Sequence, residues 1–407
     1  MGQLRAQPKK VLFVLHSLAV GGMETFAIDL AGEMARRSIA VSVVFPEAPE
    51  FDVLEQRFTA AGCTVVRLST DHHGSRFEQL KALRGFVGYV RSLKPDVVHI
   101  HTGGAAGGLA VVLMVKMFTK AQLVLTEHSI PDENPPRYHK LGRPFLDWRL
   151  DALVCVSRRN ARMRAERIGE HAPNFASILN GIPVPEDLPA VRVQARRRIR
   201  EQHGIAADAL VIGCLVRMAH DKGIDDLIRA FALLDKDARL LLVGDGPLRA
   251  QFETLAVEKG VGDTVIFAGF QTDTESYLAA FDIFALAVPS GSMSIALLEA
   301  MGHGVPSLIT FCGPEEAIIP GVSGYCAPPN DPVGLAAALR AAGDDPEDRQ
   351  RISVGSREHV DRHFSITRVA DDYLVVYRTP RSASLPEYLR WDGPPTPYPG
   401  HHEPVEL

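Results

Sequence analysis

The sequence has few cysteines and no pair of them in a metal-binding or redox spacing. Its 407 residues contain five, which are scattered, odd in number and never arranged as C-x-x-C: Cys63, Cys155, Cys214, Cys312 and Cys326. That distribution excludes a disulfide framework and a thiolate zinc site. Cys155 and Cys214 lie in apolar runs, which predicts that both are buried. A reducing compartment fits these thiols best.

Neither a signal peptide nor a membrane-spanning segment is expected from the hydropathy pattern. The polar, basic stretch 1–10 is followed by only five apolar residues, Val11–Leu15, which is too short for a secretory leader. The longest uncharged run, Val97–Val115, contains two histidines and four glycines, whereas a membrane span would be more uniformly apolar. We therefore expect a cytoplasmic protein.

No strong excess of either charge is present. The chain has 44 Lys and Arg against 49 Asp and Glu, a net charge of −5, which is too small to indicate a nucleic-acid partner. Arginines gather locally at 158–167 and at 192–200. If both clusters lie on one face they could contact an anionic membrane peripherally at its inner face; solvated, charged helices are the preferred alternative.

Apolar runs alternate with amphipathic helical segments along most of the chain. Such near-continuous apolar strands, separated by helices, are typical of parallel sheets covered on both faces. The runs expected to form strands are Val11–Leu15, Ile39–Phe45, Thr64–Leu68, Val97–His101, Leu123–Thr126 and Ala152–Val156, then Leu210–Val216, Leu240–Val243, Val265–Ala268, Ile283–Leu286 and Pro306–Thr310. The predicted fold class is α/β, with two Rossmann-like, doubly wound domains.

Proline and arginine mark the boundary between the two halves. We predict an N-terminal domain over 1–185, a linker over 186–204 and a C-terminal domain over 205–356. The segment 357–378 returns to helical patterning. The tail 379–407 is rich in proline and poor in aliphatic residues, so we expect it to be disordered.

The segment Val216–Gly223 (VRMAHDKG) follows an apolar strand and precedes an amphipathic helix. Arg217 and Lys222 therefore lie on a loop at the carboxyl end of a strand, where ligands of open α/β sheets bind. Two cations there could bind a diphosphate and stabilise charge that develops on a leaving group. A solvated loop is the alternative for such a pair taken alone.

A second segment, Ile295–Gly304 (IALLEAMGHG), predicts a helix with Glu299 in its first turns. A carboxylate there could accept hydrogen bonds from both ribose hydroxyls of a nucleotide, while the start of the helix faces a phosphate. An exposed helical glutamate is the alternative.

Glycines and histidines at other strand ends give weaker signals. Gly21-Gly22 and the Gly246 turn could let a backbone approach a phosphate closely. His128, after a predicted strand, could bond a sugar hydroxyl or move a proton. On another strand we expect His101 to reach the cleft between the domains and His99 to pack inside.

A metal site is not expected. The one D-x-D triplet, Asp235–Asp237, falls after a helix and before a strand, on the far side of the sheet from the other candidates. We interpret it as a solvated turn, and Arg217 and Lys222 would supply the positive charge instead.

Taken in order, these segments resemble the family 4 retaining glycosyltransferases, group 1, which have the GT-B fold of two Rossmann-like domains facing across a cleft. The match spans roughly Val11 to Tyr377. The matching motifs are Gly21-Gly22-x-Glu24, Pro95-Asp96-Val97-Val98-His99-x-His101, Thr126-Glu127-His128, Val156-Ser157, Asn180-Gly181, Arg217-x4-Lys222-Gly223, Val243-Gly244-x-Gly246-Pro247, Leu298-Glu299-Ala300-Met301, Gly304-Val305-Pro306 and Gly313-x-x-Glu316 with Gly321 and Gly324.

The resemblance implies a nucleotide-sugar donor, a sugar or lipid-linked acceptor, and no metal or cofactor. It also implies that the helix near 357–378 crosses back onto the N-terminal domain. The implied catalytic positions are His128, Arg217 and Lys222. The implied donor-binding positions are Gly21, Gly22, Arg217, Lys222, Gly246, Ser292, Glu299, Gly313 and Glu316, and the acceptor would lie on the side of His101 and Glu127.

One position departs from the family pattern. A second glutamate usually stands eight residues before the one that matches Glu299, and here that position is Gly291. Ser290 or Ser292 could replace it with a neutral hydroxyl, a contact weaker by about 1–2 kcal/mol. Two alternatives to an active hexosyltransferase follow: a catalytically silent nucleotide-sugar binder, and a nucleotide-sugar epimerase.

Overall fold

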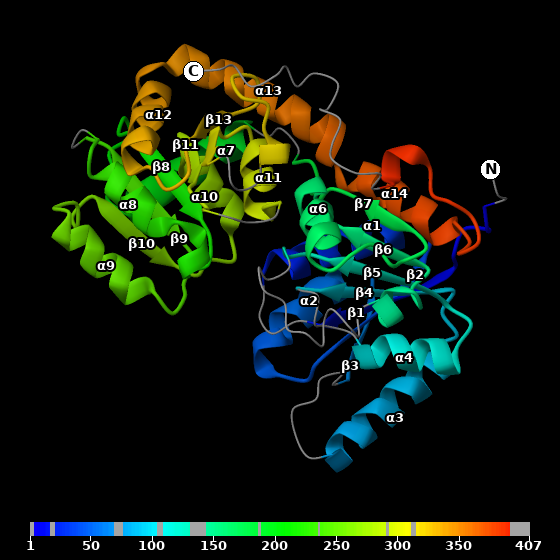
Figure 1. Cartoon of the computed structure of the whole chain (residues 1–407). Helices are drawn as coiled ribbons and strands as arrows, with labels where there is room; N and C mark the ends of the chain where they lie inside the picture. Colours follow the sequence, from blue (N-terminus) through cyan, green and yellow to red (C-terminus); the bar gives the residue numbers. More distant parts are fainter. Residues whose placement is uncertain are drawn as a thin grey trace. The chain divides into compact units, whose positions relative to one another are not determined.

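The structure is a computed structural model that describes residues 4–16, 21–68, 76–103, 109–130, 144–185, 189–234, 237–289, 293–310 and 315–390. It divides the chain into two compact units (Figure 1). The first combines residues 1–183 with 366–407, and the second comprises 184–365.

The first unit contains a seven-stranded sheet whose strands all run parallel, in the order β3-β2-β1-β4-β5-β6-β7. The strands are β1 (Lys10–His16), β2 (Ala40–Phe45), β3 (Thr64–Arg67), β4 (Val97–Thr102), β5 (Gln122–Glu127), β6 (Ala152–Cys155) and β7 (Phe175–Ser177). Every residue of β4 and β5 is buried. Their polar residues, His99, Gln122 and Glu127 among them, are buried too, because a parallel sheet is covered by helices on both faces.

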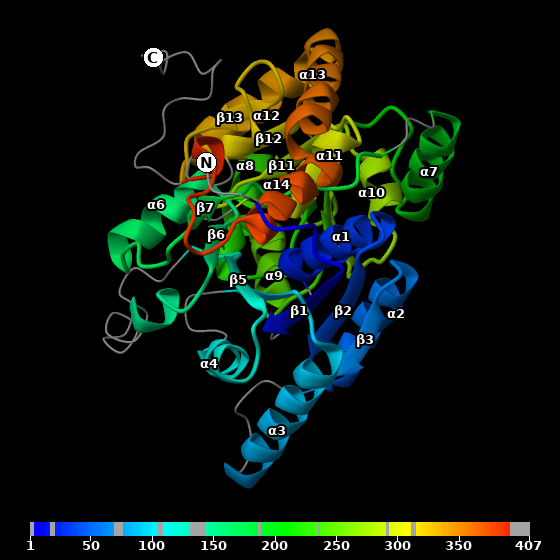
Figure 2. The ribbon, with the colours of Figure 1, turned by 90° about the vertical axis from the view of Figure 1, so that its right-hand side faces the viewer.

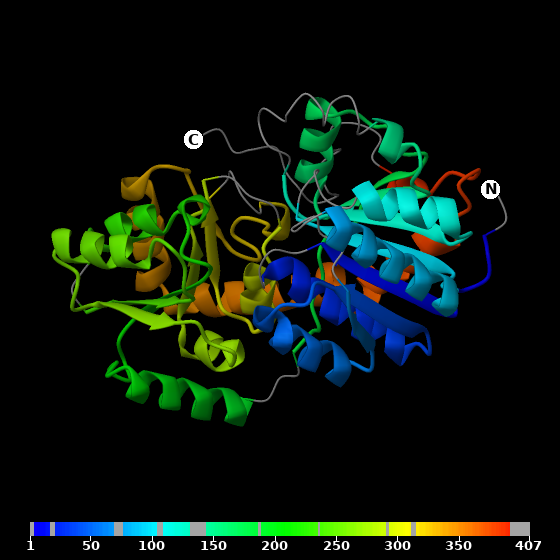
Figure 3. The same ribbon diagram turned by 90° about the horizontal axis from the view of Figure 1, so that it is seen from below.

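Helices cover the two faces of this sheet, and in Figure 3 α4 (cyan) and α1 (dark blue) lie on opposite sides of its strands. The α-helices of the unit are α1 (Gly22–Arg36), α2 (Asp52–Ala60), α3 (Arg76–Leu93), α4 (Leu109–Phe118), α6 (Arg158–Arg167) and α14 (Ile366–Arg378). Leu12, Val98 and Ile100 pack in one apolar core with Phe86 of α3 and Val111 of α4.

Helix α14 joins the first unit from almost 200 residues away in the sequence. It lies beside α1, as Figure 2 shows. Arg37, at the end of α1, is ion-paired with Asp371 and donates to the backbone oxygen of Thr367 over 2.7 Å. The crossing helix therefore begins at Ile366. The preceding residues, from 357 to Ser365, belong to the second unit, so the predicted start of this helix was too early.

The second unit contains a six-stranded parallel sheet in the order β10-β9-β8-β11-β12-β13. Its strands are β8 (Val211–Leu215), β9 (Arg239–Val243), β10 (Val265–Gly269), β11 (Ile283–Leu286), β12 (Ser307–Thr310) and β13 (Tyr325–Ala327). Its α-helices are α7 (Pro189–Gln202), α8 (Ile224–Phe231), α9 (Arg249–Glu258), α10 (Thr274–Ala280), α11 (Ile295–Gly302), α12 (Pro332–Asp344) and α13 (Pro346–Phe364). Apolar side chains of α8, α9 and α12 share one core with the strands.

The segment predicted as a linker, 186–204, is mostly helix. Residues 186–188 lie outside the described part of the chain, and α7 follows and packs on α10. Arg196 and Arg200 of α7 both bind the carboxylate of Asp282, at 2.6 and 2.7 Å. The arginines that suggested an exposed linker are thus partly internal, because Asp282 compensates their charge.

The start of the predicted disordered tail is also ordered. Thr379, Leu385 and Leu389 are buried, and a short 3₁₀ turn forms at Glu387–Leu389. Arg390 makes an antiparallel bridge with Ala176 of β7. The prediction was therefore wrong for 379–390, and residues 391–407 lie outside the described part.

Candidate active site

The first group of predicted residues lies where the strand order of the second unit reverses. Strand β8 leads outward to β9, and its other neighbour, β11, leads the opposite way to β12. The loops that follow β8 and β11 therefore flank the topological switch point, where ligands of such sheets bind. Arg217 and Lys222 follow β8, and Glu299 follows β11 on α11.

Arg217 is exposed and Lys222 is half-buried on this loop. The Lys222 ammonium lies 2.6 Å from the carboxylate of Asp221. Burial alone would raise the pKa of Asp221, but the bonded Lys222 and the nearby Arg217 lower it overall. The loop therefore carries an ionised Asp221 beside its two cations at neutral pH.

Close backbone contacts fix the position of this loop. Gly223 has a φ of +63°, and a Cβ on it would lie 1.9 Å from the carbonyl oxygen of Ala287, just after β11. A Cβ on Gly246 would lie 2.4 Å from the carbonyl oxygen of Met218, and the Met218 amide donates to the Asp245 oxygen over 2.9 Å. Gly246, predicted to bind the donor, thus lets the loops after β8 and β9 pack together.

Glu299 is half-buried in the second turn of α11. The side chain of Ser294 caps this helix by accepting a hydrogen bond from the Leu297 amide. Glu316 is half-buried in the 3₁₀ turn η3 (Glu315–Ala317) that follows β12. Both carboxylates therefore follow strands at the same edge of the sheet as Arg217. Ser290, Gly291, Ser292 and Gly313 lie outside the described residues.

The first unit has its own switch point, between β1 and β4. Gly21 and Gly22 are exposed at the start of α1, after β1. The Gly21 amide donates to the Glu24 carboxylate over 2.7 Å, so Glu24 caps the helix. His101 and His128 come from β4 and from the end of β5, on the other side of this switch point.

The structure buries both histidines of β4. His99 and His101 are each 0% exposed, whereas His101 was predicted to reach a cleft. The two lie two residues apart on one strand, so their side chains share a face, and α1 and α14 cover it. His99 therefore packs inside, as predicted, whereas the prediction that His101 reaches a cleft is wrong.

His101 and His128 lie together. His101 Nδ1 is 3.1 Å from His128 Nε2, and the two rings are tilted by 32°. His128 is 7% exposed, and burial lowers its pKa to about 3. Burial, with the neighbouring histidines, also lowers the pKa of His101 well below 6.5. Both rings are thus neutral at pH 7.

His99 joins helix α14 to the sheet. The Tyr377 hydroxyl lies 2.7 Å from His99 Nδ1, and the Thr126 hydroxyl lies 2.7 Å from His99 Nε2. Tyr373 contacts Thr126 in turn, at 3.2 Å between the hydroxyl oxygens. Neither tyrosine was predicted from the sequence, because helical spacing does not reveal which strand a distant helix covers.

Glu127, predicted on the acceptor side, lies in a buried ion cluster instead. It is 1% exposed, and its carboxylate accepts from Arg164 Nε over 3.1 Å. Arg164 of α6 is 0% exposed and is also ion-paired with Asp147, while its Nη1 donates to the Gly169 backbone oxygen over 2.7 Å. This role of Arg164 was not predicted, because in the sequence Arg164 lies among arginines that were expected to be solvated.

The arginine clusters are thus divided between interior and surface. Arg164, Arg196 and Arg200 form internal ion pairs, whereas Arg162 and Arg197 are exposed. In the described part of the chain, no helix is long and apolar enough to cross a membrane. Nor do three His, Cys, Asp or Glu side chains of that part gather as a metal site would require.

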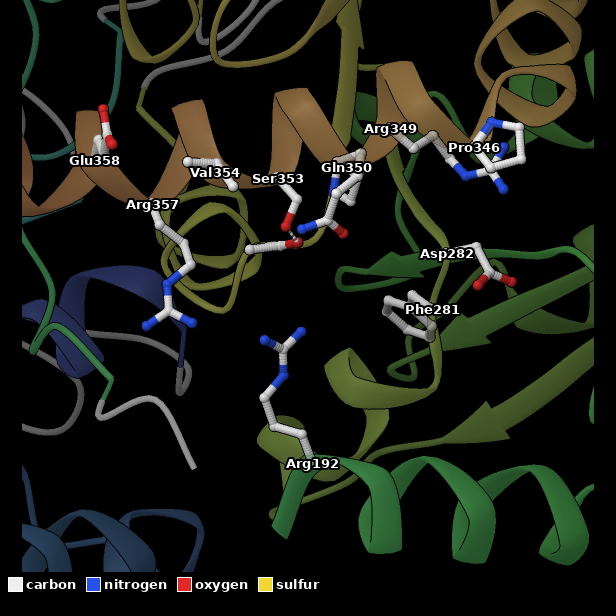
Figure 4. A pocket seen from close by; sticks show the side chains of 12 residues that line it. Arg192, Phe281, Asp282, Pro346, Arg349, Gln350, Ser353, Val354, Arg357 and Glu358 are labelled. Atoms are coloured by element: carbon white, nitrogen blue, oxygen red, sulfur yellow. Dashed lines mark hydrogen bonds between the residues drawn. The ribbon is translucent and has the colours of Figure 1, made fainter. Parts of the chain in front are cut away.

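A pocket of about 620 Å³ opens at the opposite edge of the second sheet, beside the amino ends of β11 and β12. Figure 4 shows Arg192 of α7 and Arg357 of α13 pointing toward one another across it. None of the described residues that line it is a predicted site residue. The pocket is therefore separate from the candidate site.

Comparison with known proteins identifies the family. A model described as Glycosyltransferase Family 4 matches residues 20–185, and one described as Glycosyl transferases group 1 matches residues 195–359. The lipopolysaccharide core biosynthesis glycosyltransferase LpsD of Rhizobium meliloti (strain 1021) is 36% identical over 255 residues, which cover 57% of this chain and 74% of that protein. The chain belongs to the family 4, group 1 glycosyltransferases.

Another relative of this glycosyltransferase is the D-inositol 3-phosphate glycosyltransferase of Geodermatophilus obscurus, which is 28% identical over 391 residues and covers 88% of this chain and 84% of that protein. Among solved structures, a glycosyltransferase from Rickettsia africae ESF-5 matches with a TM-score of 0.77 at 17% identity, over 90% of this chain and 97% of that one. Anabaena HepE in complex with UDP and glucose matches with a TM-score of 0.75 at 21% identity, over 90% and 98% of the two chains. The fold is therefore GT-B.

Proposed function

We propose that this glycosyltransferase moves a hexose-type sugar from a nucleotide diphosphate sugar to a glycan, lipid or small-molecule acceptor, with retention of the anomeric configuration and without a metal ion. The observation that carries the proposal is the loop of Arg217 and Lys222, which backbone contacts hold at the switch point of the second sheet. Anabaena HepE, whose fold is shared, has been solved with UDP and with UDP-glucose.

In this proposal the second unit binds the donor. Arg217 and Lys222 contact the diphosphate and stabilise the charge that develops on it as the bond to the sugar breaks. Glu299 accepts hydrogen bonds from the ribose hydroxyls, and Glu316 contacts the sugar or the phosphate. In the first unit, the family resemblance assigns Gly21 and Gly22 a role in binding the diphosphate.

The transfer itself follows the mechanism that the family resemblance implies. The acceptor hydroxyl attacks the anomeric carbon on the face from which the diphosphate departs, and the leaving phosphate oxygen takes the hydroxyl proton. His128 is neutral at pH 7 because burial lowers its pKa to about 3. It therefore contacts the donor sugar as a neutral hydrogen-bonding group, whereas an imidazolium would be costly there.

For a lipid-linked acceptor, the proposal includes a peripheral contact with an anionic membrane surface through exposed arginines such as Arg162 of α6. The buried thiols of Cys63 and Cys214 are free, which supports an enzyme that works in a reducing compartment.

The test is a screen of UDP-, GDP- and ADP-sugars in the presence of EDTA, followed by proton NMR of the released sugar. We expect slow hydrolysis of one donor in the absence of an acceptor, with the first-formed sugar keeping the anomeric configuration of the donor. A first-formed product of opposite configuration would contradict retention, and activity that appears only after Mn²⁺ or Mg²⁺ is added would contradict metal-free transfer.

A further inference from the structure

His101 lies inside the first unit with one nitrogen bonded and the other not. Its ring packs on Phe13, 4.8 Å away between centroids, and on His99, 4.0 Å away. Nδ1 is 3.1 Å from His128 Nε2. Nε2 is fully buried and has no hydrogen-bond partner among the described residues.

This asymmetry determines which nitrogen carries the proton. A neutral imidazole has one N–H donor and one acceptor nitrogen. Buried N–H groups without a partner are rare in proteins, because a donor removed from water loses its hydrogen bond. The N–H of His101 therefore belongs on Nδ1, where His128 accepts it, and the unprotonated nitrogen is Nε2.

We propose that His101 is a positioning residue that donates its Nδ1 proton to His128 Nε2 and thereby holds His128 in the tautomer that carries its own proton on Nδ1. A hydrogen bond at one ring nitrogen of a histidine selects the form of the other in this way. Because both rings are neutral at pH 7, each carries one proton, and the hydrogen bond between them determines which nitrogen of His128 carries it.

The consequence of this tautomer for catalysis rests on the proposed function, in which His128 contacts the donor sugar. In the Nδ1–H tautomer, the one proton that His128 can donate is on Nδ1, and His101 already occupies Nε2. His128 would then act by hydrogen bonding through Nδ1, and proton transfer through Nε2 is excluded. The assignment of the tautomer itself does not depend on the reaction.

The experiment is nitrogen-15 NMR of the full-length protein with labelled histidine, recorded at pH 7.5. The His128 signals are identified by their loss in a His128→Gln variant. Shifts of the two ring nitrogens report directly which one is protonated. We expect His128 Nδ1 to be protonated and Nε2 to be unprotonated; the reverse pattern, or an even mixture, would overturn the proposal.

Two substitutions of His101 then test its role. The amide nitrogen of an asparagine can occupy the position of Nδ1, so His101→Asn should keep the Nδ1–H form of His128. His101→Leu removes the donor and should shift the signal toward the Nε2–H form. An unchanged tautomer in His101→Leu would overturn the proposal. Should that variant not fold, the wild-type and His101→Asn spectra still decide.

Tyr377→Phe provides the control. It removes a buried hydrogen bond to His99 in the same cluster but leaves the contact between His101 and His128. We expect no change in the His128 tautomer. A change as large as that in His101→Leu would show that any disturbance of the cluster shifts the tautomer, and it would overturn the positioning role of His101. All these readings are made without substrate, so they stay valid if the proposed donor chemistry fails.

Discussion

Gly223 and Ala287 are in backbone contact across the switch point of the second sheet. The space at the Gly223 α-carbon is so small that a Cβ there would lie 1.9 Å from the Ala287 carbonyl oxygen. Gly223 ends the loop of Arg217 and Lys222, and Ala287 follows β11. The contact therefore joins the loops on the two sides of the proposed donor site, so a change at Gly223 should alter both.

Gly223→Ala should unfold the second unit or displace this loop. The new Cβ meets backbone, which cannot give way as a flexible side chain can, and the φ of +63° is unfavourable for alanine. We expect a loss of more than about 3 kcal/mol in the free energy of unfolding, measured by circular dichroism in urea.

Gly260→Ala is the matched control for this substitution. Gly260 has a φ of +73°, but no atom lies within 4 Å of its Cβ position. The control should therefore lose only about 1 kcal/mol, the cost of the left-handed conformation. Equal losses of unfolding free energy in the two variants would show that the close contact with Ala287 does not affect stability.

Arg164→Met should destabilise the first unit strongly. The substitution removes the buried cation that pairs with Glu127 and with Asp147, and breaking such a buried pair typically costs about 3–5 kcal/mol. Unfolding of the first unit is followed in urea by the fluorescence of Trp148, which belongs to this unit, in a Trp391→Phe background. Arg162→Met, on the exposed side of the same helix, should change stability by less than about 0.5 kcal/mol.

The stability of the first unit should fall as the pH drops below 6.5. Burial lowers the pKa of His128 to about 3 and those of His99 and His101 well below 6.5. Below pH 6.5 the unfolded chain therefore binds protons that the folded unit does not accept. Each of these histidines removes up to about 1.4 kcal/mol per pH unit.

Asp29 acts in the opposite direction, because burial raises the pKa of its carboxyl to about 6. Below pH 6 the folded unit holds a proton on Asp29 that the unfolded chain does not hold. This proton stabilises the folded unit and offsets the loss of stability from about one histidine. Tryptophan fluorescence in urea at pH 7.5, 6.5 and 5.5 measures the net effect, and His101→Asn should reduce the slope. A flat profile would contradict the neutral state of the cluster.

Glu299→Gln should weaken nucleotide binding through the ribose alone. The amide keeps the size of the side chain but loses the charge-assisted hydrogen bonds, which are about twice as strong as neutral ones. We expect a roughly 10-fold loss of affinity for the ribonucleoside diphosphate and little change for its 2′,3′-dideoxy analogue, both measured by calorimetry. Equal losses of affinity for the two ligands would show that Glu299 does not bind the ribose hydroxyls.

The sequence predicted those parts of the fold whose residues follow a local pattern. Strands β1 and β8 are continuous apolar runs because parallel strands are buried on both faces, and the expected burial of Cys155 and Cys214 is confirmed. Strands β7 and β13 were missed, since three residues are too few to carry a pattern.

The errors arose where distant residues determine the outcome. Arg200 is charged in the sequence and buried in the structure because Asp282, 82 positions later, pairs with it. His101 is covered because Phe26 of α1, from a distant part of the sequence, packs against its ring. Of the proposed site, the loop residues were predictable from strand ends, whereas the contact between His101 and His128 depends on tertiary packing.

The proposed donor site requires that Arg217 and Lys222 bind a nucleotide diphosphate. The deciding measurement is calorimetric titration with UDP, GDP and ADP in the presence of EDTA. The comparison is between the wild type, Arg217→Ala/Lys222→Ala, and the control Arg197→Ala/Lys259→Ala, which removes two exposed cations elsewhere on the second unit.

We predict that one diphosphate binds the wild type and the control equally well and binds the Arg217→Ala/Lys222→Ala variant about 10- to 100-fold more weakly, because charged hydrogen bonds contribute about 1.5–3 kcal/mol each. Binding that is unchanged in that variant, or reduced as much in the control, would contradict the assignment of the donor site to this loop.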